Sequence, residues 1–308
     1  MVVSVTDDPS ATTRRRFLAG IAAGAGGGVG AGCLAMGGSV ETVSMLAAGS
    51  LQTALEHGLG PDLDARLQAE TRGSAVLARQ VAAGQKDPDV VAVADVALFE
   101  SPLDPSWHAT FATNAVVLAY NPETAGGRRV AAAAPDEWYR PLLEETVRLG
   151  RTDPDLDPLG YRTLFALELA TDHYGTAAAL REVVPSRDQL YPETQLVSQL
   201  ETGSVDAAFV YRNMAVERGY DYVSLPEAVD LSDPDGADQY ATTSYELPDG
   251  TVVLGAPIRY GATVRRGTDP VYDVFGALVD GAFLTEFGFS VPGKYPQFTD
   301  DAPQRVAN

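Results

Sequence analysis

The stretch Arg148–Thr163, RLGRTDPDLDPLGYRT, decides how the centre of this chain folds and contains a contradiction that bears on function. Asp157 followed by Pro158 predicts the start of a helix, because an acidic side chain caps the first turn and proline has a helical φ. The free N–H groups of such a turn form a ready-made anion site. A carboxylate at its mouth, however, repels an ordinary anion. We take this contradiction as the main clue to function.

Three further turns have the same character. Ser50 follows a glycine in LAAGSLQTALE, Ser74 follows a glycine in RGSAVLARQV, and Glu193 follows a proline in Tyr191–Thr194. Each predicts free N–H groups at the positive end of a helix dipole. Taken singly, Ser50, Ser74 and Asp157 are more often plain N-caps, and Glu193 a favourable first-turn charge. Four such turns in one chain favour a ligand site.

Apolar runs predict strands that alternate with helices, which is typical of an α/β protein with parallel sheets. One strand ends at Tyr211, whose hydroxyl is either a donor to a ligand or the polar tip of a core side chain. Asp230–Gly250 is acidic and rich in turn residues, so we expect a surface loop there. The strands are expected at 42–48, 89–94, 111–120, 205–211, 222–225 and 252–262, and the helices from 51 and at 75–83, 161–170, 196–200 and 272–284.

Composition narrows the class of protein. The 308 residues carry a formal charge of −20, which argues against general binding to nucleic acid or to an anionic membrane. Lys86 and Lys294 are the only lysines, so the other 20 of the 22 basic residues are arginines. Many carboxylates with almost no lysine indicate adaptation to high salt, where the Debye length falls to roughly 3 Å at 1 M. The alternative is a merely acidic protein.

The N-terminus is typical of an export signal. Arg14–Arg16 precede a weakly apolar run that holds seven glycines up to Gly32, which suits a twin-arginine signal better than a membrane-spanning helix. Gly30-Ala31-Gly32-Cys33 resembles a degenerate lipobox, so Cys33, the only cysteine, is expected to carry a lipid anchor. The alternatives are a basic arm and a small buried cysteine. We expect the protein on the extracellular face of the cell membrane.

Six segments together resemble the substrate-binding proteins of molybdate/tungstate ABC importers, in their archaeal tungstate/molybdate-binding branch. The resemblance covers roughly residues 42–290. The segments are AGSLQTALE (48–56), RGSAVLARQVAAG (72–84), PDVVAVAD (88–95), FATNAVVLAYNP (111–122), GRTDPDLDPLGYRTL (150–164) and VDAAFVYRNMA (205–215).

The resemblance implies a type II periplasmic-binding-protein fold, with two α/β lobes that close around the oxyanion. It also implies a monomer that delivers its ligand to a membrane permease and holds no cofactor. The expected divisions are a signal peptide with lipobox at 1–32, a linker at 33–41, a first lobe at 42–117 and 240–296, a second lobe at 118–239, and a tail at 297–308.

The same resemblance assigns roles to site residues. Ser50 and Ser74 would donate hydroxyl and backbone N–H bonds, Leu159 a backbone N–H, and Tyr211 its hydroxyl. Asp157 and Glu193 would reach the metal of the oxyanion. Leucine at 159 departs from the small residue or cysteine that the family often has there.

Metal coordination would resolve the contradiction at Asp157. Molybdenum(VI) and tungsten(VI) are d⁰ centres that can expand from four oxygen ligands to six, and two carboxylates can supply the extra hard ligands. Sulfur in sulfate cannot expand in this way. Asp157 and Glu193 would therefore repel sulfate and phosphate while bonding tungstate or molybdate. The sequence does not separate these last two.

Three other functions stay open. The two serines would also suit a receptor for sulfate, phosphate or another oxyanion. An exported hydrolase could use Asp157 and Glu193 as an acid/base pair, although no sugar-binding aromatic residues accompany them. A structural surface protein fits four ligand-type turns poorly. Other enzyme classes lack support, because the three histidines have no metal-ligand spacing and the chain has no P-loop or convincing nucleophile elbow.

Overall fold

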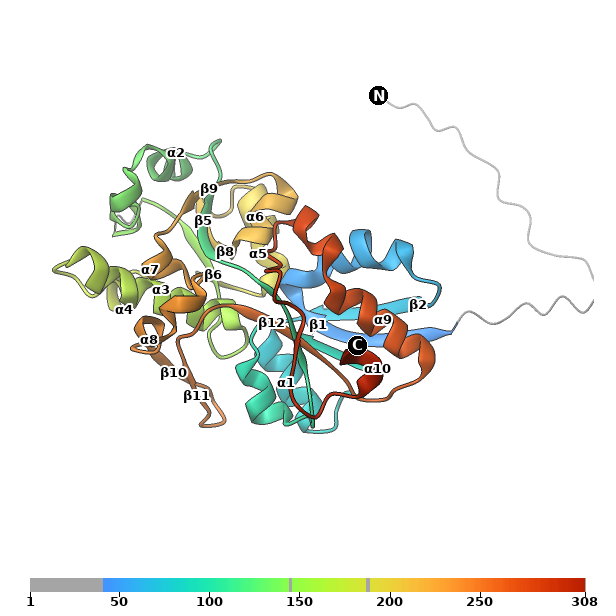
Figure 1. Ribbon diagram of the computed structural model, residues 1–308. Coiled ribbons are helices and arrows are strands. Elements are labelled where there is room, and N and C mark those ends of the chain that lie inside the picture. The colour runs from blue at the N-terminus through green and yellow to red at the C-terminus, as the bar shows by residue number, and fades with distance from the viewer. Residues whose placement is uncertain (1–40, 144–145, 187–188, 308) are drawn as a thin grey trace, which may run out of the picture. The chain divides into compact units, whose positions relative to one another are not determined.

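Two β-sheets with helices packed against them organise the part of the chain that the computed structural model describes, residues 41–143, 146–186 and 189–307 (Figure 1). These residues belong to one compact unit. We call the elements around the first sheet the first lobe and those around the second sheet the second lobe. The expected signal sequence and Cys33 lie outside the described residues. Within the described ranges, no helix is long and apolar enough to cross a membrane.

The first sheet is mixed. Its strand β1 pairs in parallel with β2 on one side and β3 on the other, whereas β12 pairs antiparallel with β3 and β4. All four residues of β3, VVAV, are buried, which explains its unbroken apolar run. The strand order is β13 (Gln297–Phe298), β4 (Ala109–Thr113), β12 (Arg259–Val264), β3 (Val90–Val93), β1 (Thr42–Ala48) and β2 (Arg66–Arg72).

The second sheet is also mixed. Its strand β6 pairs in parallel with β7 and β8, and β5 pairs antiparallel with β8 and β9. Every residue of β8, AAFVY, is buried. The strand order is β7 (Leu190–Tyr191), β6 (Leu149–Thr152), β8 (Ala207–Tyr211), β5 (Val116–Tyr120) and β9 (Asp221–Ser224).

Helices pack on both sheets. In the first lobe, α1 contacts β1, and α9 lies along β12, β4 and β1 (Figure 1). In the second lobe, α3 packs on β5, β6 and β8, while α5 and α6 also pack on β8. The helices are α1 (Ser74–Ala82), α2 (Ala125–Ala132), α3 (Pro158–Tyr174), α4 (Leu180–Val183), α5 (Glu193–Glu201), α6 (Arg212–Arg218), α7 (Glu227–Asp230), α8 (Ala237–Tyr240), α9 (Asp269–Asp280) and α10 (Gln304–Ala307).

The single strand expected over 111–120 is wrong. The run is two strands in different sheets, β4 and β5, separated by Asn114 and Ala115. The chain therefore crosses from the first lobe to the second at Asn114, a polar residue in an apolar run. The strand expected over 252–262 is likewise two strands, because β11 (Val252–Leu254) forms a hairpin with β10 (Ser244–Glu246) before β12 begins.

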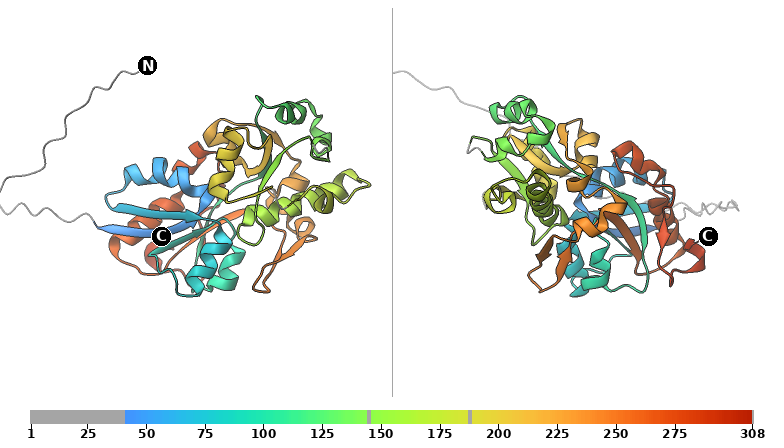
Figure 2. Two further views of the ribbon diagram at one scale, coloured as in Figure 1. Left: turned by 180° about the vertical axis from the view of Figure 1, so that it is seen from behind. Right: turned by 60° about the vertical axis from the view of Figure 1, so that its left-hand side comes forward.

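The hairpin also corrects the loop expected over 230–250. The hairpin of β10 and β11 lies beside α8 and forms a two-stranded sheet of its own (Figures 1 and 2). Its strand β10 contacts the second lobe, since Arg181 donates to the carbonyl of Ser244 and the Tyr245 hydroxyl donates to Asp155. Its turn contacts the first lobe, where Ser101 Oγ lies 3.5 Å from Thr251 Oγ1. The part of the chain that returns to the first lobe is thus folded, and it contacts both lobes.

Both crossovers explain why the sheets are mixed and not parallel as expected. A strand that enters a lobe by a crossover begins at the edge where the other strands end, so it runs antiparallel to them. β5 begins just after the first crossover, and β12 just after the second. The two crossovers lie side by side, because Arg259 of β12 pairs with Thr113 of β4.

Candidate functional site

The predicted site residues follow the carboxyl ends of strands in both lobes. In the first lobe, Ser50 follows β1 and Ser74 follows β2, and the two strand ends are adjacent because Ala48 pairs with Arg72. In the second lobe, Glu193 follows β7 and Tyr211 ends β8. Ligands of open α/β sheets bind outside such strand ends. The fold thus assembles the site at the edge of each sheet that faces the other lobe.

Two buried carboxylates form the centre of the site. Asp157 caps α3, and its Oδ1 accepts a hydrogen bond from the N–H of Leu159 at 2.7 Å. Glu193 is the first residue of α5. The two residues are only 3% and 4% exposed. Among the described residues, no N–H or hydroxyl group donates to Asp157 Oδ2 or Glu193 Oε1, although the two carboxyl groups interact with each other. Each carboxylate thus keeps one oxygen available to a ligand.

Burial perturbs both acids. It raises the pKa of Asp157 to about 6, against the opposing effect of the Leu159 N–H. Burial also raises the pKa of Glu193 well above its ordinary value, and the neighbouring charge of Asp157 adds to the rise. In the absence of a ligand, burial therefore disfavours the ionised form of both carboxyl groups.

Glycines of the first lobe give these carboxylates room. A Cβ on Gly49 would lie 2.3 Å from Glu193 Oε2, and a Cβ on Gly73 would lie 2.4 Å from the carbonyl oxygen of Leu156 and 3.0 Å from Asp157 Oδ2. Real Cβ atoms do not approach other atoms so closely. Each Gly-Ser turn therefore accepts one acidic turn of the opposite lobe.

Hydroxyl groups surround the carboxylates. Ser74 Oγ accepts from the N–H of Ala94 at 3.0 Å, and the Tyr211 hydroxyl accepts from Arg162 at 2.8 Å. Neither hydroxyl donates a hydrogen bond to another of the described residues, so its proton can be given to a ligand oxygen. Ser50 Oγ lies 2.9 Å from the hydroxyl of Tyr260.

Two amide side chains tie the site to the first crossover. Asn114 Nδ2 donates to Asn213 Oδ1 at 2.7 Å and to the Tyr260 hydroxyl at 3.3 Å. Asn213 Nδ2 donates to the carbonyl of Ser50 at 2.8 Å. All three side chains are buried. The turn at Ser50 is thereby held by residues of the crossover and of the second lobe.

A cavity of about 260 Å³ opens beside Asp157, between elements of the two lobes. Of the two carboxylates, Asp157 lines this cavity. Its lining residues are Arg72, Gly73, Val76, Asp153, Leu156, Asp157, Leu190, Tyr191 and Pro192.

The structure brings all the predicted site residues into one buried region. Electrostatic interactions join Glu193 to Asp157, Ser50 and Tyr211, and Gly73 next to Ser74 contacts Asp157. The N–H of Leu159, expected to bind the ligand, is taken by Asp157 in this arrangement.

Sequence reasoning missed four polar residues of this region: Asn114, Arg162, Asn213 and Tyr260. Arg162 and Asn114 had a signal, because each is a polar residue within an apolar pattern. Nothing marked Tyr260, which lies in a strand like other core aromatics. No group of three or more His, Cys, Asp or Glu that could hold a metal ion occurs in the described ranges.

The acid pair predicts an unusual pH dependence of stability. Because the folded-state pKa values are raised, the unliganded chain should lose stability as pH rises from about 5 to about 8, by roughly 1–3 kcal/mol. Glu193→Gln removes one charge and should reduce this loss. Urea unfolding at both pH values measures it, with the exposed Glu182→Gln as the matched control. A loss as large in Glu193→Gln as in the unmodified chain would contradict the assignment.

Comparisons with known proteins agree with this architecture. Residues 36–270 match the bacterial extracellular solute-binding protein family. A Haloferax volcanii protein with the provisional name of ABC transporter molybdenum-binding protein is 54% identical over 296 residues, 95% of this chain and 96% of its own. A molybdate/tungstate-binding protein of Thermococcus kodakarensis is 30% identical over 237 residues, 68% of this chain and 66% of its own.

Solved structures share the fold. The periplasmic molybdate-binding protein of Azotobacter vinelandii has a TM-score of 0.54 at 15% identity, covering 81% of this chain and 99% of its own. The sulfate-binding protein SubI of Mycobacterium tuberculosis also has a TM-score of 0.54, at 14% identity, covering 82% and 88%. A molybdate and a sulfate receptor resemble the chain equally well, so the fold alone does not select the oxyanion. By its sequence and its two-lobe α/β fold, this chain belongs to the extracellular solute-binding protein family of ABC transporters.

Proposed function

We propose that the protein captures tungstate or molybdate between its lobes and delivers it to the permease of an ABC importer. The observation that carries this proposal is the buried pair Asp157 and Glu193, each with one oxygen that receives no hydrogen bond from a donor group of the described residues. The names of the Haloferax and Thermococcus relatives support the same ligand class. The role is binding and delivery, not catalysis, in keeping with a family of transport proteins.

The carboxylates would select the ligand by coordination. Tungsten(VI) and molybdenum(VI) accept additional oxygen ligands, and Asp157 Oδ2 and Glu193 Oε1 are two hard oxygens that receive no hydrogen bond from a donor group of the described residues. Sulfate and phosphate centres do not expand in this way, so they would gain no bond to the two carboxylates and would be repelled by them wherever they are ionised. The same two residues thus attract one kind of oxyanion and reject the other.

Hydroxyl groups would hold the ligand oxygens. Ser74 and Tyr211 each have a proton that is not used in the hydrogen bonds described above, and Ser50 lies beside Glu193. Neutral donors suit a site whose carboxylates already bind the metal, since they add no further charge. The two lobes would contribute different groups, so binding would favour their closed arrangement.

Export and anchoring complete the proposal. The twin-arginine signal and the lipobox cysteine Cys33 would place the protein on the outer face of the membrane, where an importer receives its substrate. The excess of carboxylates over lysine would keep the chain soluble in high salt, where its self-repulsion is screened.

Isothermal titration calorimetry in molar NaCl tests the ligand class. Tungstate and molybdate should bind tightly, and excess sulfate should give no heat. Asp157→Ala combined with Glu193→Ala should weaken tungstate binding by orders of magnitude, because both metal ligands are lost. Sulfate binding of similar strength, or unchanged affinity in the double variant, would show a general oxyanion pocket. If none of the three ions gives a heat of binding, the hydrolase function is favoured. Hydrolysis of a chromogenic substrate then tests for that activity.

Proton exchange on binding separates coordination from simple hydrogen bonding. Metal coordination requires ionised carboxylates, so tungstate binding should release protons and weaken as pH falls through about 6, where Asp157 titrates. An oxyanion that is only hydrogen-bonded would instead bind with proton uptake. Calorimetric titration in two buffers of different ionisation enthalpy shows whether binding releases protons or takes them up. Asp157→Asn should reduce the release, and proton uptake by the unmodified chain would contradict coordination.

Gly73→Ala tests whether binding needs close approach of the lobes. The new methyl group would collide with the carbonyl of Leu156 in the opposite lobe, so tungstate affinity should fall by about tenfold or more. Gly73 has a φ of −57°, which alanine also adopts, so each lobe should still fold. Gly276→Ala is the matched control, since its Cβ would meet nothing within 4 Å. Equal affinities of the two variants would contradict closure at this turn.

A further inference from the structure

We propose that Arg162 is a positioning residue that latches the two lobes together and couples their closure to Tyr211, the expected hydroxyl donor to the ligand. This inference rests on the proposed function, because it concerns how the same site holds its oxyanion. Arg162 lies one turn into α3, in the second lobe. Its guanidinium group is 3% exposed and has partners in both lobes.

Two contacts hold Arg162 to the first lobe. Nη1 donates to the carbonyl of Ala94 at 2.6 Å, and Nη2 lies 3.2 Å from Asp95 Oδ2. Ala94 and Asp95 directly follow β3, the strand beside β1. The hydroxyl of Tyr161, the neighbour of Arg162 on α3, also donates to Asp95 Oδ2, at 2.7 Å. Tyr161 and Arg162, two successive residues of the second lobe, therefore both contact the carboxylate of Asp95 in the first lobe.

A third contact joins Arg162 to the site. Nη1 donates to the Tyr211 hydroxyl at 2.8 Å. Both protons of Nη1 are then in use, one on Ala94 and one on Tyr211. Because the Tyr211 oxygen accepts this bond, its own proton points elsewhere and becomes a stronger donor. One nitrogen atom thus links the first lobe to a group expected to touch the ligand.

The same network extends to the other hydroxyl donor. The carbonyl of Ala94 accepts from Arg162, and its N–H donates to Ser74 Oγ at 3.0 Å. A single peptide segment of the first lobe is therefore bonded to Ser74 on one side and to Arg162 on the other. Separating the lobes would break the Arg162 contacts and leave the orientation of both hydroxyl groups less defined.

The energetics favour a latch over a simple structural ion pair. A buried ion pair gains little over water unless hydrogen bonds satisfy both partners, and removal of one partner is strongly destabilising. Here Asp95 is also bonded to the N–H of Ala97 at 3.1 Å, so both ions are well satisfied when the lobes meet. Lobe opening would separate the charges, which makes the pair sensitive to closure.

The test measures how fast tungstate leaves. Asp95→Asn keeps the size of the side chain but removes the charge that Arg162 contacts. Bound radioactive tungstate, chased with excess unlabelled tungstate, should dissociate at least about tenfold faster from the full-length variant in molar NaCl. Excess sulfate should still give no heat of binding with this variant, because Asp95 is not expected to touch the ligand.

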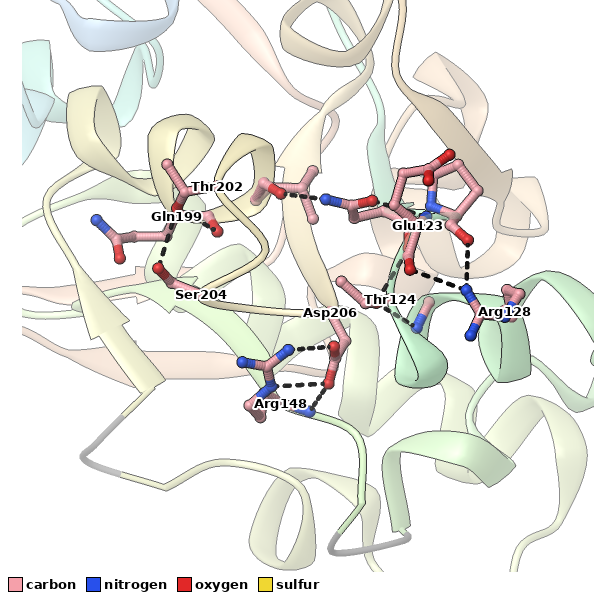
Figure 3. A network of polar contacts seen from close by, with 12 residues as sticks. Glu123, Thr124, Arg128, Arg148, Gln199, Thr202, Ser204 and Asp206 are labelled. Carbon is pink, nitrogen blue, oxygen red and sulfur yellow. Dashed lines mark hydrogen bonds and ion pairs between the residues drawn. The ribbon is translucent and has the colours of Figure 1, made fainter.

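A matched control comes from an ion pair inside the second lobe. Arg148 contacts Asp206 with two nitrogens, Nη2 at 2.6 Å from Oδ1 and Nε at 3.1 Å from Oδ2 (Figure 3). Both residues belong to the lobe of β6 and β8, so lobe opening leaves this pair intact. Asp206→Asn should therefore release tungstate at the rate of the unmodified chain.

Arg162→Lys gives a second, independent variant. Lysine keeps the positive charge, but its single ammonium nitrogen cannot contact Ala94, Asp95 and Tyr211 at once as the planar guanidinium group does. It should also speed dissociation, and adding Asp95→Asn to it should change the rate little further, since both act on one contact. Tight binding by the unmodified chain with unchanged release from Asp95→Asn and Arg162→Lys would overturn the latch alone. Absence of tungstate binding by the unmodified chain would overturn the proposed function as well.

Discussion

The burial of two carboxylates from one lobe against two Gly-Ser turns of the other is the constraint on which the site depends. Asp157 and Glu193 cannot both be ionised at this depth without a cost, and burial accordingly raises both pKa values. Only glycine leaves space for them on the opposite side. The unliganded protein therefore keeps a poorly satisfied centre, and a high-valent metal would satisfy it. Function here rests on an arrangement that does not favour stability.

Local sequence signals, such as helix caps and tight turns, predicted much of this site. An acidic cap followed by proline marked the start of α3, and Gly-Ser after an apolar run marked the turns that follow β1 and β2. Such signals are local, because caps and close turns depend on neighbouring residues alone. Burial of the apolar strands was predictable for the same reason, since a continuous apolar run suits a strand covered on both faces.

What the sequence did not predict depends on distant contacts. The break at Asn114 and the antiparallel entry of β5 and β12 follow from which sheet each segment joins, and an apolar run looks the same in either sheet. Arg162 could be recognised as an arginine within a helix, but two of its partners, Ala94 and Asp95, lie in the other lobe. Tyr260 carried no signal at all, since its role depends on the proximity of Ser50, 210 residues away in the sequence.

The two crossovers between the lobes lie next to each other, and the site lies beside them. Asn114 bonds to Tyr260 and Asn213, and Asn213 bonds to Ser50, so the ligand groups sit close to the axis about which the lobes would turn. Motion about such an axis grows in proportion to distance from it. A change of a few tenths of an ångström around a small oxyanion would therefore become a much larger displacement at the outer surfaces. The geometry acts as a lever, by which a membrane partner could sense an ion that it does not yet touch.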